Sequence, residues 1–179
     1  MQAQQQSESR TVWSLDREHS TVEFAVKKLF LFTVKGRLTN LSGSLVLDEK
    51  TISKSSVSVT IRASSIDTGN KDRDAHLRSS SFLNANENPD IQFQSTEVGP
   101  GRDRDTLIVK GSLTVRDKTI EVRLDVTEVD RSKSPNGTEV IYYVAETELD
   151  RHAFGVSGWR GVVASKLKVV INVQANREL

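Results

Sequence analysis

The sequence carries three histidines, and three imidazoles are enough to hold a catalytic zinc ion with water as the fourth ligand. His19, His76 and His152 come from three distant segments, however, and no His-x-His or HExxH spacing joins any two of them. The chain has no cysteine, which excludes thiol nucleophiles, cysteine-ligated zinc and iron–sulfur clusters. The sequence therefore predicts no metal site and no cofactor.

One stretch, Thr68–Phe93, departs from the alternating pattern of the rest of the chain and concentrates charged side chains. Asp72 and His76 stand four residues apart, as do Asp74 and Arg78, and residues at this spacing share one face of a helix. We expect a helix of two or three turns here, with the Asp72 carboxylate holding the His76 imidazole. This helix would cover one end of an otherwise all-β body.

Two further contacts are hypotheses about this helix. We expect Arg73 and Asp74 to tie it to the rim of the β body. Asp74 could instead form a buried ion pair with Arg151, which lies far along the chain.

Three consecutive serines, at positions 79–81, follow His76 closely enough to suggest a hydrolase. No G-x-S-x-G turn surrounds any serine, and no loop resembles an oxyanion hole. We interpret the serines as the polar end of the helix, and the sequence favours binding over catalysis.

Most of the remaining chain alternates apolar and polar residues, which is the pattern of half-buried strands. Such runs cover 12–16, 20–26, 34–48, 56–61, 91–98, 107–115, 120–129, 140–149 and 167–173. Short connections join most of them, so we expect an antiparallel up-and-down barrel or a strongly curved sandwich.

Two places break this alternation. Between Leu38 and Leu41 the apolar positions change parity, shortly before Gly43, which predicts a bulge or bend. Leu29–Phe32 is a run of four large apolar residues. We interpret this run as a two-sided strand or as a helical turn sunk in a cavity.

Length and charge bound the class of protein. A chain of 179 residues fits one domain, and we assign residues 1–10 to a polar flexible tail and 11–179 to the barrel. Lys and Arg number 25 against 24 Asp and Glu, so nucleic acid is not expected as a partner. The first ten residues lack the apolar stretch of a signal peptide, which predicts a cytoplasmic protein, or a periplasmic one if a leader was removed. No run reaches the about 18 apolar residues of a membrane helix.

The composition also suggests a hollow interior. Eight strands close to a barrel just wide enough to hold one small ligand. Val, Leu and Ile dominate the alternating faces, while the chain has only 6 Phe and 2 Trp, so side chains would underfill the barrel.

An ordered set of motifs carries a family resemblance. The pieces are WSLDREHSTVEF, VKGRL, IDTGNKDRDAHLRSSSF, PDIQF, GSLTVRDKTIEVRLDV and DRHAFG, followed by a closing strand. In this order and spacing the chain resembles the YceI family, lipocalin-like bacterial domains that bind polyisoprenoid lipids. The resemblance spans about Val12 to Ala175 and implies an all-β, eight-stranded antiparallel barrel with a helix near one end. It also implies a hollow interior for a prenyl or acyl chain, and binding without catalysis.

The resemblance and the apolar pattern together give candidate site residues. We expect the interior to be lined by Val22, Phe24, Val26, Phe30, Leu31, Leu77, Phe82, Phe93 and Phe154. Candidates for the headgroup or rim are His19, Arg73, Asp74, His76 and Arg151. The chain departs from the family pattern at Lys28, Ser81, Leu83, Asn84 and Ala153, which leaves the headgroup open.

We therefore expect a protein that binds an isoprenoid lipid, such as a polyprenyl carrier or a quinone, or a fatty-acyl lipid, without stable membrane insertion. Two alternatives remain. One is an enzyme that modifies such a lipid with His19 or His76 as acid–base, and the other is a stress-response module whose main partner is a protein. We also expect that the protein could form a homodimer, because edge and rim surface would be exposed.

Overall fold

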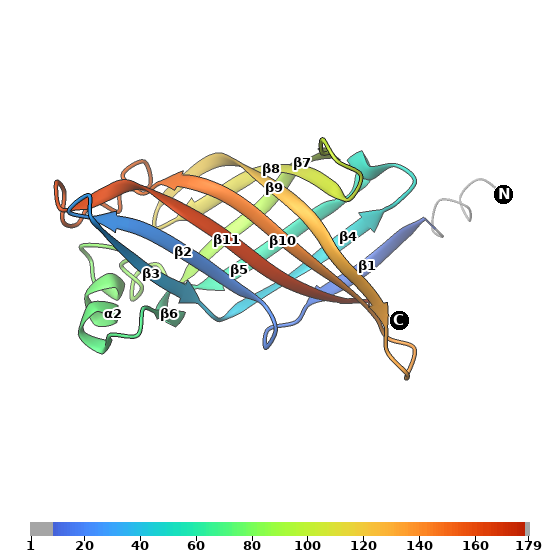
Figure 1. Ribbon diagram of the computed structural model, residues 1–179, viewed down its shortest axis with the longest axis horizontal. Coiled ribbons are helices and arrows are strands. Elements are labelled where there is room, and N and C mark those ends of the chain that lie inside the picture. The colour runs from blue at the N-terminus through green and yellow to red at the C-terminus, as the bar shows by residue number, and fades with distance from the viewer. Residues whose placement is uncertain (1–8, 178–179) are drawn as a thin grey trace.

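A computed structural model describes residues 9–177 as one antiparallel sheet that closes on itself, with a helix at one end (Figure 1). Its strands are β1 (Arg10–Leu15), β2 (Thr21–Lys28), β3 (Phe32–Leu38), β4 (Leu41–Asp48), β5 (Ser56–Arg62), β6 (Ile66–Asp67), β7 (Asp90–Pro100), β8 (Thr106–Val115), β9 (Lys118–Lys133), β10 (Glu139–Asp150) and β11 (Val163–Arg177). The helix α2 (Lys71–Arg78) follows β6, and the 3-10 turns η1 (Ile52–Lys54) and η2 (Ala63–Ser65) flank β5.

Three of the long strands are interrupted, so that each appears as two shorter ones. β1 continues into β2, β3 into β4, and β5 into β6, because β1 pairs with β4, β2 with β3, and β6 with β3. Together with β7 to β11 these make the eight strands of a closed antiparallel barrel. The predicted all-β, eight-stranded barrel with one short helix is confirmed.

The last strand closes the barrel. One edge of β11 pairs with β10, and its other edge pairs first with β2 and then with β1. Val22 lies opposite Ile171, and Trp13 lies opposite Arg177. The first and last strands of the chain are therefore neighbours along the whole length of the wall.

The parity change between Leu38 and Leu41 marks one of the interruptions, as the sequence predicts. The backbone N–H groups of Thr39 and Asn40 both donate to the Ser65 hydroxyl, at 3.2 Å, in place of ladder partners. Further along, a Cβ at Gly43 would lie 2.1 Å from the Ser58 carbonyl oxygen, so only glycine fits this close approach.

The helix α2 lies where the sequence places it. Asn70 caps its start by accepting from the Arg73 backbone N–H at 3.0 Å. The expected side-chain pairs four residues apart are wrong, because in residues 9–177 no hydrogen bond or ion pair joins Asp72 to His76 or Asp74 to Arg78. Asp74 turns back toward the start of the helix instead, and His76 packs against aromatic rings.

Two apolar clusters divide the interior. The smaller one, which we call the end cluster, consists of Trp13, Leu47, Ile141, Tyr143 and Ala175 at the end of the barrel away from α2. Trp13, Ile141 and Ala175 are at most 1% exposed. The larger cluster lines the remaining length up to α2. The aromatic side chains of Trp13 and Tyr143 therefore help to fill the end of the barrel where β1 begins and β11 ends. This end lies on the right in Figure 1.

No helix in residues 9–177 is long and apolar enough to cross a membrane. The predicted tail over residues 1–10 lies outside the described residues except for Ser9 and Arg10, and Arg10 already belongs to β1.

Candidate functional site

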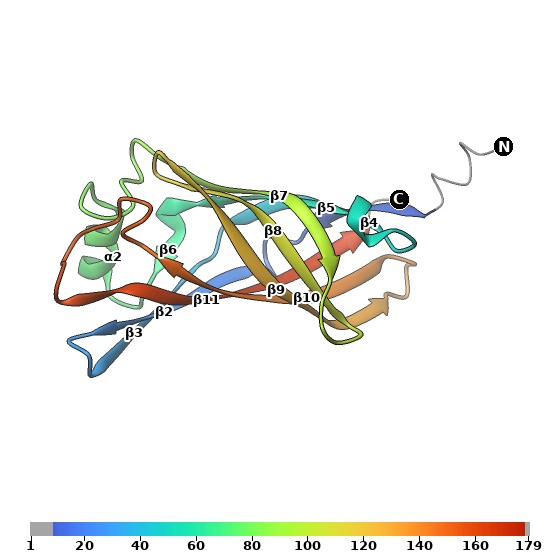
Figure 2. The same cartoon turned by 90° about the horizontal axis from the view of Figure 1, so that it is seen from above.

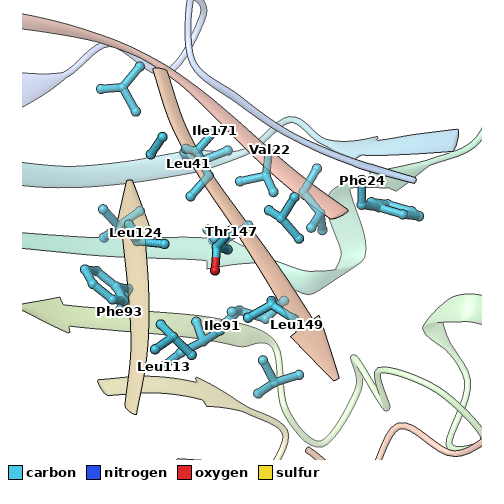
Figure 3. A pocket seen from close by; sticks show the side chains of 18 of the residues that line it. Val22, Phe24, Leu41, Ile91, Phe93, Leu113, Leu124, Thr147, Leu149 and Ile171 are labelled. Atoms are coloured by element: carbon cyan, nitrogen blue, oxygen red, sulfur yellow. The ribbon is translucent and has the colours of Figure 1, made fainter. Parts of the chain in front are cut away.

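The barrel encloses a cavity of about 310 Å³ that extends from the end cluster to α2. Figure 3 shows side chains from facing strands directed into one space, among them Val22, Leu41, Phe93, Leu124 and Leu149. Valine, leucine, isoleucine and phenylalanine make up most of the lining. The volume is at the lower edge of the roughly 300–1,000 Å³ typical of small-molecule sites, so the barrel has room for an apolar occupant.

Most of the predicted lining residues face this cavity. Those that do are Val22, Phe24, Val26, Leu77, Phe82, Phe93 and Phe154. They come from β2, α2, the turns after α2, β7 and the loop between β10 and β11. Their contact with a ligand stays a prediction.

Strands β8 to β11 supply much of the wall, and the candidate residues named from the sequence include none of them. Leu113, Leu124, Ala145 and Val169 line the cavity from these four strands. The signal was present, because each of these residues lies on the apolar face of an alternating run. Alternation alone does not say which apolar face meets a cavity and which meets a packed core.

Two aromatic rings lie over glycines in the wall. A Cβ at Gly36 would come within 2.5 Å of the Phe24 ring, and a Cβ at Gly111 would come within 2.5 Å of the Phe93 ring. Phe24 and Gly36 are direct cross-strand partners. Each ring therefore takes the place of a missing side chain on the wall, which leaves the centre of the barrel open.

The expectation that Phe30 and Leu31 line the interior is wrong. Leu29–Leu31 form the turn of the β2–β3 hairpin and Phe32 begins β3, and Phe30 is 93% and Leu31 80% exposed. Leu29 and Phe30 have positive φ angles of 51° and 59°, as the two central residues of a type I′ turn require. The run reverses the chain outside the barrel, so its side chains reach neither face of the wall.

Arg151 is buried at the α2 end and organises the loop that follows it. Its guanidinium donates to the carbonyl oxygens of Ala164 and Val163 at 2.9 Å each, Val156 at 2.9 Å and Gly158 at 2.7 Å. Burial, and then the charge of Arg160, lower the pKa of the Arg151 guanidinium below its ordinary value. Backbone carbonyl dipoles hold this cation, and within residues 9–177 no carboxylate hydrogen-bonds to it.

The hypothesis of an Asp74–Arg151 ion pair is therefore wrong. The Asp74 carboxylate accepts from the Thr68 backbone N–H at 2.9 Å and from the Thr68 hydroxyl at 2.6 Å. Arg73 reaches the same residue, since its Nε donates to the Thr68 hydroxyl at 2.7 Å and its Nη2 to the Thr68 carbonyl at 2.8 Å. Both side chains thus tie α2 to the chain leaving β6, in keeping with the expected rim contact.

A second arginine, which is not among the candidate residues named from the sequence, holds loops at the same end. Nη1 of Arg116, in the β8–β9 turn, lies 3.0–3.2 Å from the carbonyl oxygens of Ser80, Phe82 and Gly155. It joins the turns after α2 to the β10–β11 loop. A lone arginine in a hairpin turn carries no sequence signal of such a role.

The three histidines lie apart, and none lines the cavity. His19 sits in the break between β1 and β2, where its Nδ1 is 3.1 Å from Asp16. His76 packs edge-on against the rings of Phe82 and Trp159. Among residues 9–177 no group of three or more His, Asp or Glu side chains could hold a metal ion.

His152 is the least expected of the three. Its Nε2 is buried without a hydrogen-bond partner. Burial lowers the pKa of the His152 imidazole below its ordinary value, and the charges of Arg151 and Arg160 lower it further. The neutral imidazole is therefore the form that this loop accommodates.

Comparison with known sequences places the whole barrel in one family. Residues 13–175 match the family described as YceI-like domain. A UPF0312 protein of Pectobacterium atrosepticum is 32% identical over 168 residues, which cover 93% of this chain and 86% of that protein. Protein YceI of Shigella flexneri is 30% identical over 164 residues, which cover 90% of this chain and 85% of that protein.

Solved structures share the fold. The YCEI protein of Campylobacter jejuni has 25% sequence identity and a TM-score of 0.76, covering 86% of this chain and 90% of its own. A polyisoprenoid binding domain from Saccharophagus degradans has 14% identity and a TM-score of 0.68, covering 94% of this chain and 99% of its own. At that identity the second match shows the fold alone.

Proposed function

The chain belongs to the YceI-like domain family, and from this premise we propose that it binds a long-chain isoprenoid lipid, or a similar amphiphile, inside its barrel. A polyprenyl carrier or an isoprenoid quinone fits this description best. The protein would transport, store or sequester the lipid away from water.

The observation that carries this proposal is the apolar cavity. Its lining has 40 residues, and the polar ones are Ser55, Ser56, Tyr143, Thr147 and Arg151. Thr147 uses its hydroxyl on the Arg123 carbonyl at 2.9 Å, and Arg151 uses its guanidinium on four carbonyls. An occupant therefore meets carbon on nearly every side. Burying a chain there gains about 0.8 kcal/mol for each methylene-sized group, so a few isoprene units bind without polar contacts.

The Saccharophagus degradans domain supports the class of ligand, because it is described as polyisoprenoid binding. Both proteins form the same barrel, so a prenyl chain is the first ligand to test. The enzyme alternative lacks such support, since it requires His19 or His76 beside the bound lipid and neither residue lines the cavity.

The test is mass spectrometry of the purified protein, both intact under native conditions and after extraction with organic solvent. The proposal expects one prenyl or acyl species bound per chain, and the extract identifies its headgroup. Protein that is empty, and that also takes up neither added quinones nor fatty acids, would overturn the proposal.

A further inference from the structure

The most exposed apolar surface in residues 9–177 is the end of the β2–β3 hairpin, Leu29–Phe32, which we call the apolar tip. The exposed fractions are 49% for Leu29, 93% for Phe30, 80% for Leu31 and 61% for Phe32. In residues 9–177, five of the seven exposed large apolar side chains are these four and Trp159, which is 48% exposed. Figure 2 shows the hairpin projecting from the barrel at the same end as α2.

Trp159 belongs to the same surface as the apolar tip. The Leu29 backbone N–H donates to the Val162 carbonyl at 2.8 Å, which joins the tip to the β10–β11 loop. The Lys28 ammonium lies 5.3 Å from the centre of the Trp159 ring. Tip and tryptophan therefore form one apolar patch.

The backbone shows that the large side chains are costly here. Leu29, Phe30 and Trp159 all have positive φ angles, of 51°, 59° and 56°. Asparagine and glycine adopt this conformation easily, and Asn-Gly is a favoured pair where two successive turn residues both have positive φ. A turn built for stability alone would not place leucine and phenylalanine at these positions, so the side chains themselves are the feature to explain.

The two chain segments that carry the patch have charges of one sign. The segments 26–35 and 152–163 contain Lys27, Lys28, Lys35 and Arg160 and no aspartate or glutamate. The chain as a whole is balanced, with 25 basic and 24 acidic residues. Exposed phenylalanine, leucine and tryptophan with lysine and arginine beside them along the chain suit a partner with an apolar interior and an anionic surface. An anionic lipid bilayer has both properties.

We propose that the apolar tip and Trp159 insert into the interfacial region of an anionic bilayer while Lys27, Lys35 and Arg160 meet its headgroups. Val26 at the base of the hairpin already lines the cavity. β3 pairs with β6 only at Arg37 and Leu38 in residues 9–177, so the part of β3 nearer the tip has no strand partner on that side. Docking would bring this unpaired edge of β3 to the membrane. The docking does not require the proposed lipid binding, whereas its purpose rests on that binding.

Vesicle binding tests the proposal. The probes are vesicles of phosphatidylcholine, with or without about one third phosphatidylglycerol, in a flotation assay. Trp159 is an intrinsic reporter, because the other tryptophan, Trp13, is buried at the far end and does not change its surroundings. We expect binding to the anionic vesicles together with a blue shift of the Trp159 emission.

The main variant replaces Leu29→Asn together with Phe30→Gly, which removes two apolar side chains and installs the favoured turn. It should keep or raise the melting temperature and weaken vesicle binding about tenfold or more. A matched control, Val12→Thr with Val129→Thr, removes exposed apolar surface away from the tip and should bind as the parent does. Lys27→Gln with Lys35→Gln should weaken binding to anionic vesicles several-fold and leave binding to neutral ones unchanged.

Equal vesicle binding by the parent and the Asn-Gly variant would overturn the proposal, as would a parent that binds no vesicles. If the parent instead self-associates and the variant does not, the tip is an interface between copies of the chain and membrane docking is wrong. A parent that binds vesicles but never contains lipid keeps the docking and removes the proposed function.

Discussion

The two ends of the barrel are built in opposite ways. At the end cluster, Trp13 and its neighbours fill the lumen, and ion pairs such as Arg131 with Glu49 and Arg177 with Glu139 join segments at the same end. At the α2 end, arginines hold loops through backbone carbonyls, and large apolar side chains point into solvent. The first arrangement maximises burial, and the second holds loops in place while leaving apolar surface free. From this contrast we expect the end cluster to contribute most to stability and, under the proposed lipid binding, the α2 end to be where ligand exchanges.

Removing the Trp13 side chain from the end cluster should have the largest effect on stability. Trp13→Ala deletes a side chain that is 1% exposed, so it should lower the free energy of unfolding by about 3–5 kcal/mol. Urea denaturation measures this loss. Val12→Ala, at an adjacent position that is 41% exposed, should cost about 0.5 kcal/mol or less. Equal losses in the two variants would contradict the role of the end cluster.

Breaking the hydrogen bonds of Arg151 at the α2 end should lower the free energy of unfolding by less than the loss of Trp13 does. Arg151→Lys keeps the charge but cannot reach four carbonyl oxygens, so it should lose about 2–3 kcal/mol and free the 152–162 loop. Limited proteolysis with mass spectrometry of the fragments would locate the first cut. If the first cut fell in the β9–β10 turn instead of the 152–162 loop, the hydrogen bonds of Arg151 would not be what holds the α2 end.

Filling the lumen should separate binding from stability. Ala145 lines the cavity from β10, so Ala145→Phe places a ring in the space where we propose that the lipid binds. We expect about a tenfold drop in co-purifying lipid, with the melting temperature retained. Ala25→Phe, on the opposite face of the wall from Phe24, is the matched control and should keep its lipid. Unchanged lipid content in Ala145→Phe would place the ligand elsewhere.

Acid should loosen the two ends at different pH values, and this is the smallest effect. The pKa of His152 is lowered by burial, so between that pKa and about 6.5 the unfolded chain binds more protons and stability falls as the pH falls. The pKa of Asp48, near the end cluster, is lowered chiefly by the Thr51 backbone N–H, so its contribution is lost only below about pH 4.

The variant His152→Leu isolates the first of these steps. Urea denaturation of the parent should show lower stability at pH 5 than at pH 7, and the variant should show a smaller difference. An identical pH dependence in parent and variant would exclude His152 as its source.

The sequence was sufficient for the parts of this structure that depend on local pattern. Alternation located the strands, and the parity change at Leu38 and Leu41 located a break in one of them. It failed where a residue's role depends on distant backbone. Asp74 and Arg151 have complementary charges, but nearer partners satisfied each of them: Thr68 for the carboxylate and four carbonyls for the guanidinium.

The apolar tip shows a different limit. Four consecutive large apolar residues normally signal burial, because exposing them is costly. In Leu29–Phe32 the turn geometry overrides that preference, and no local pattern predicts that type I′ angles will be imposed on leucine and phenylalanine.

The pairing of β11 with both β1 and β2 has a consequence for folding during synthesis. The backbone groups on one edge of β1 and β2 can form their ladder hydrogen bonds only with β11. The barrel therefore cannot close during synthesis until its last strand has been made. Until then the future cavity wall is an open, apolar sheet. Contacts this distant in sequence form slowly, in milliseconds to seconds. A chaperone, or the lipid itself, would find its best opportunity to bind in that interval.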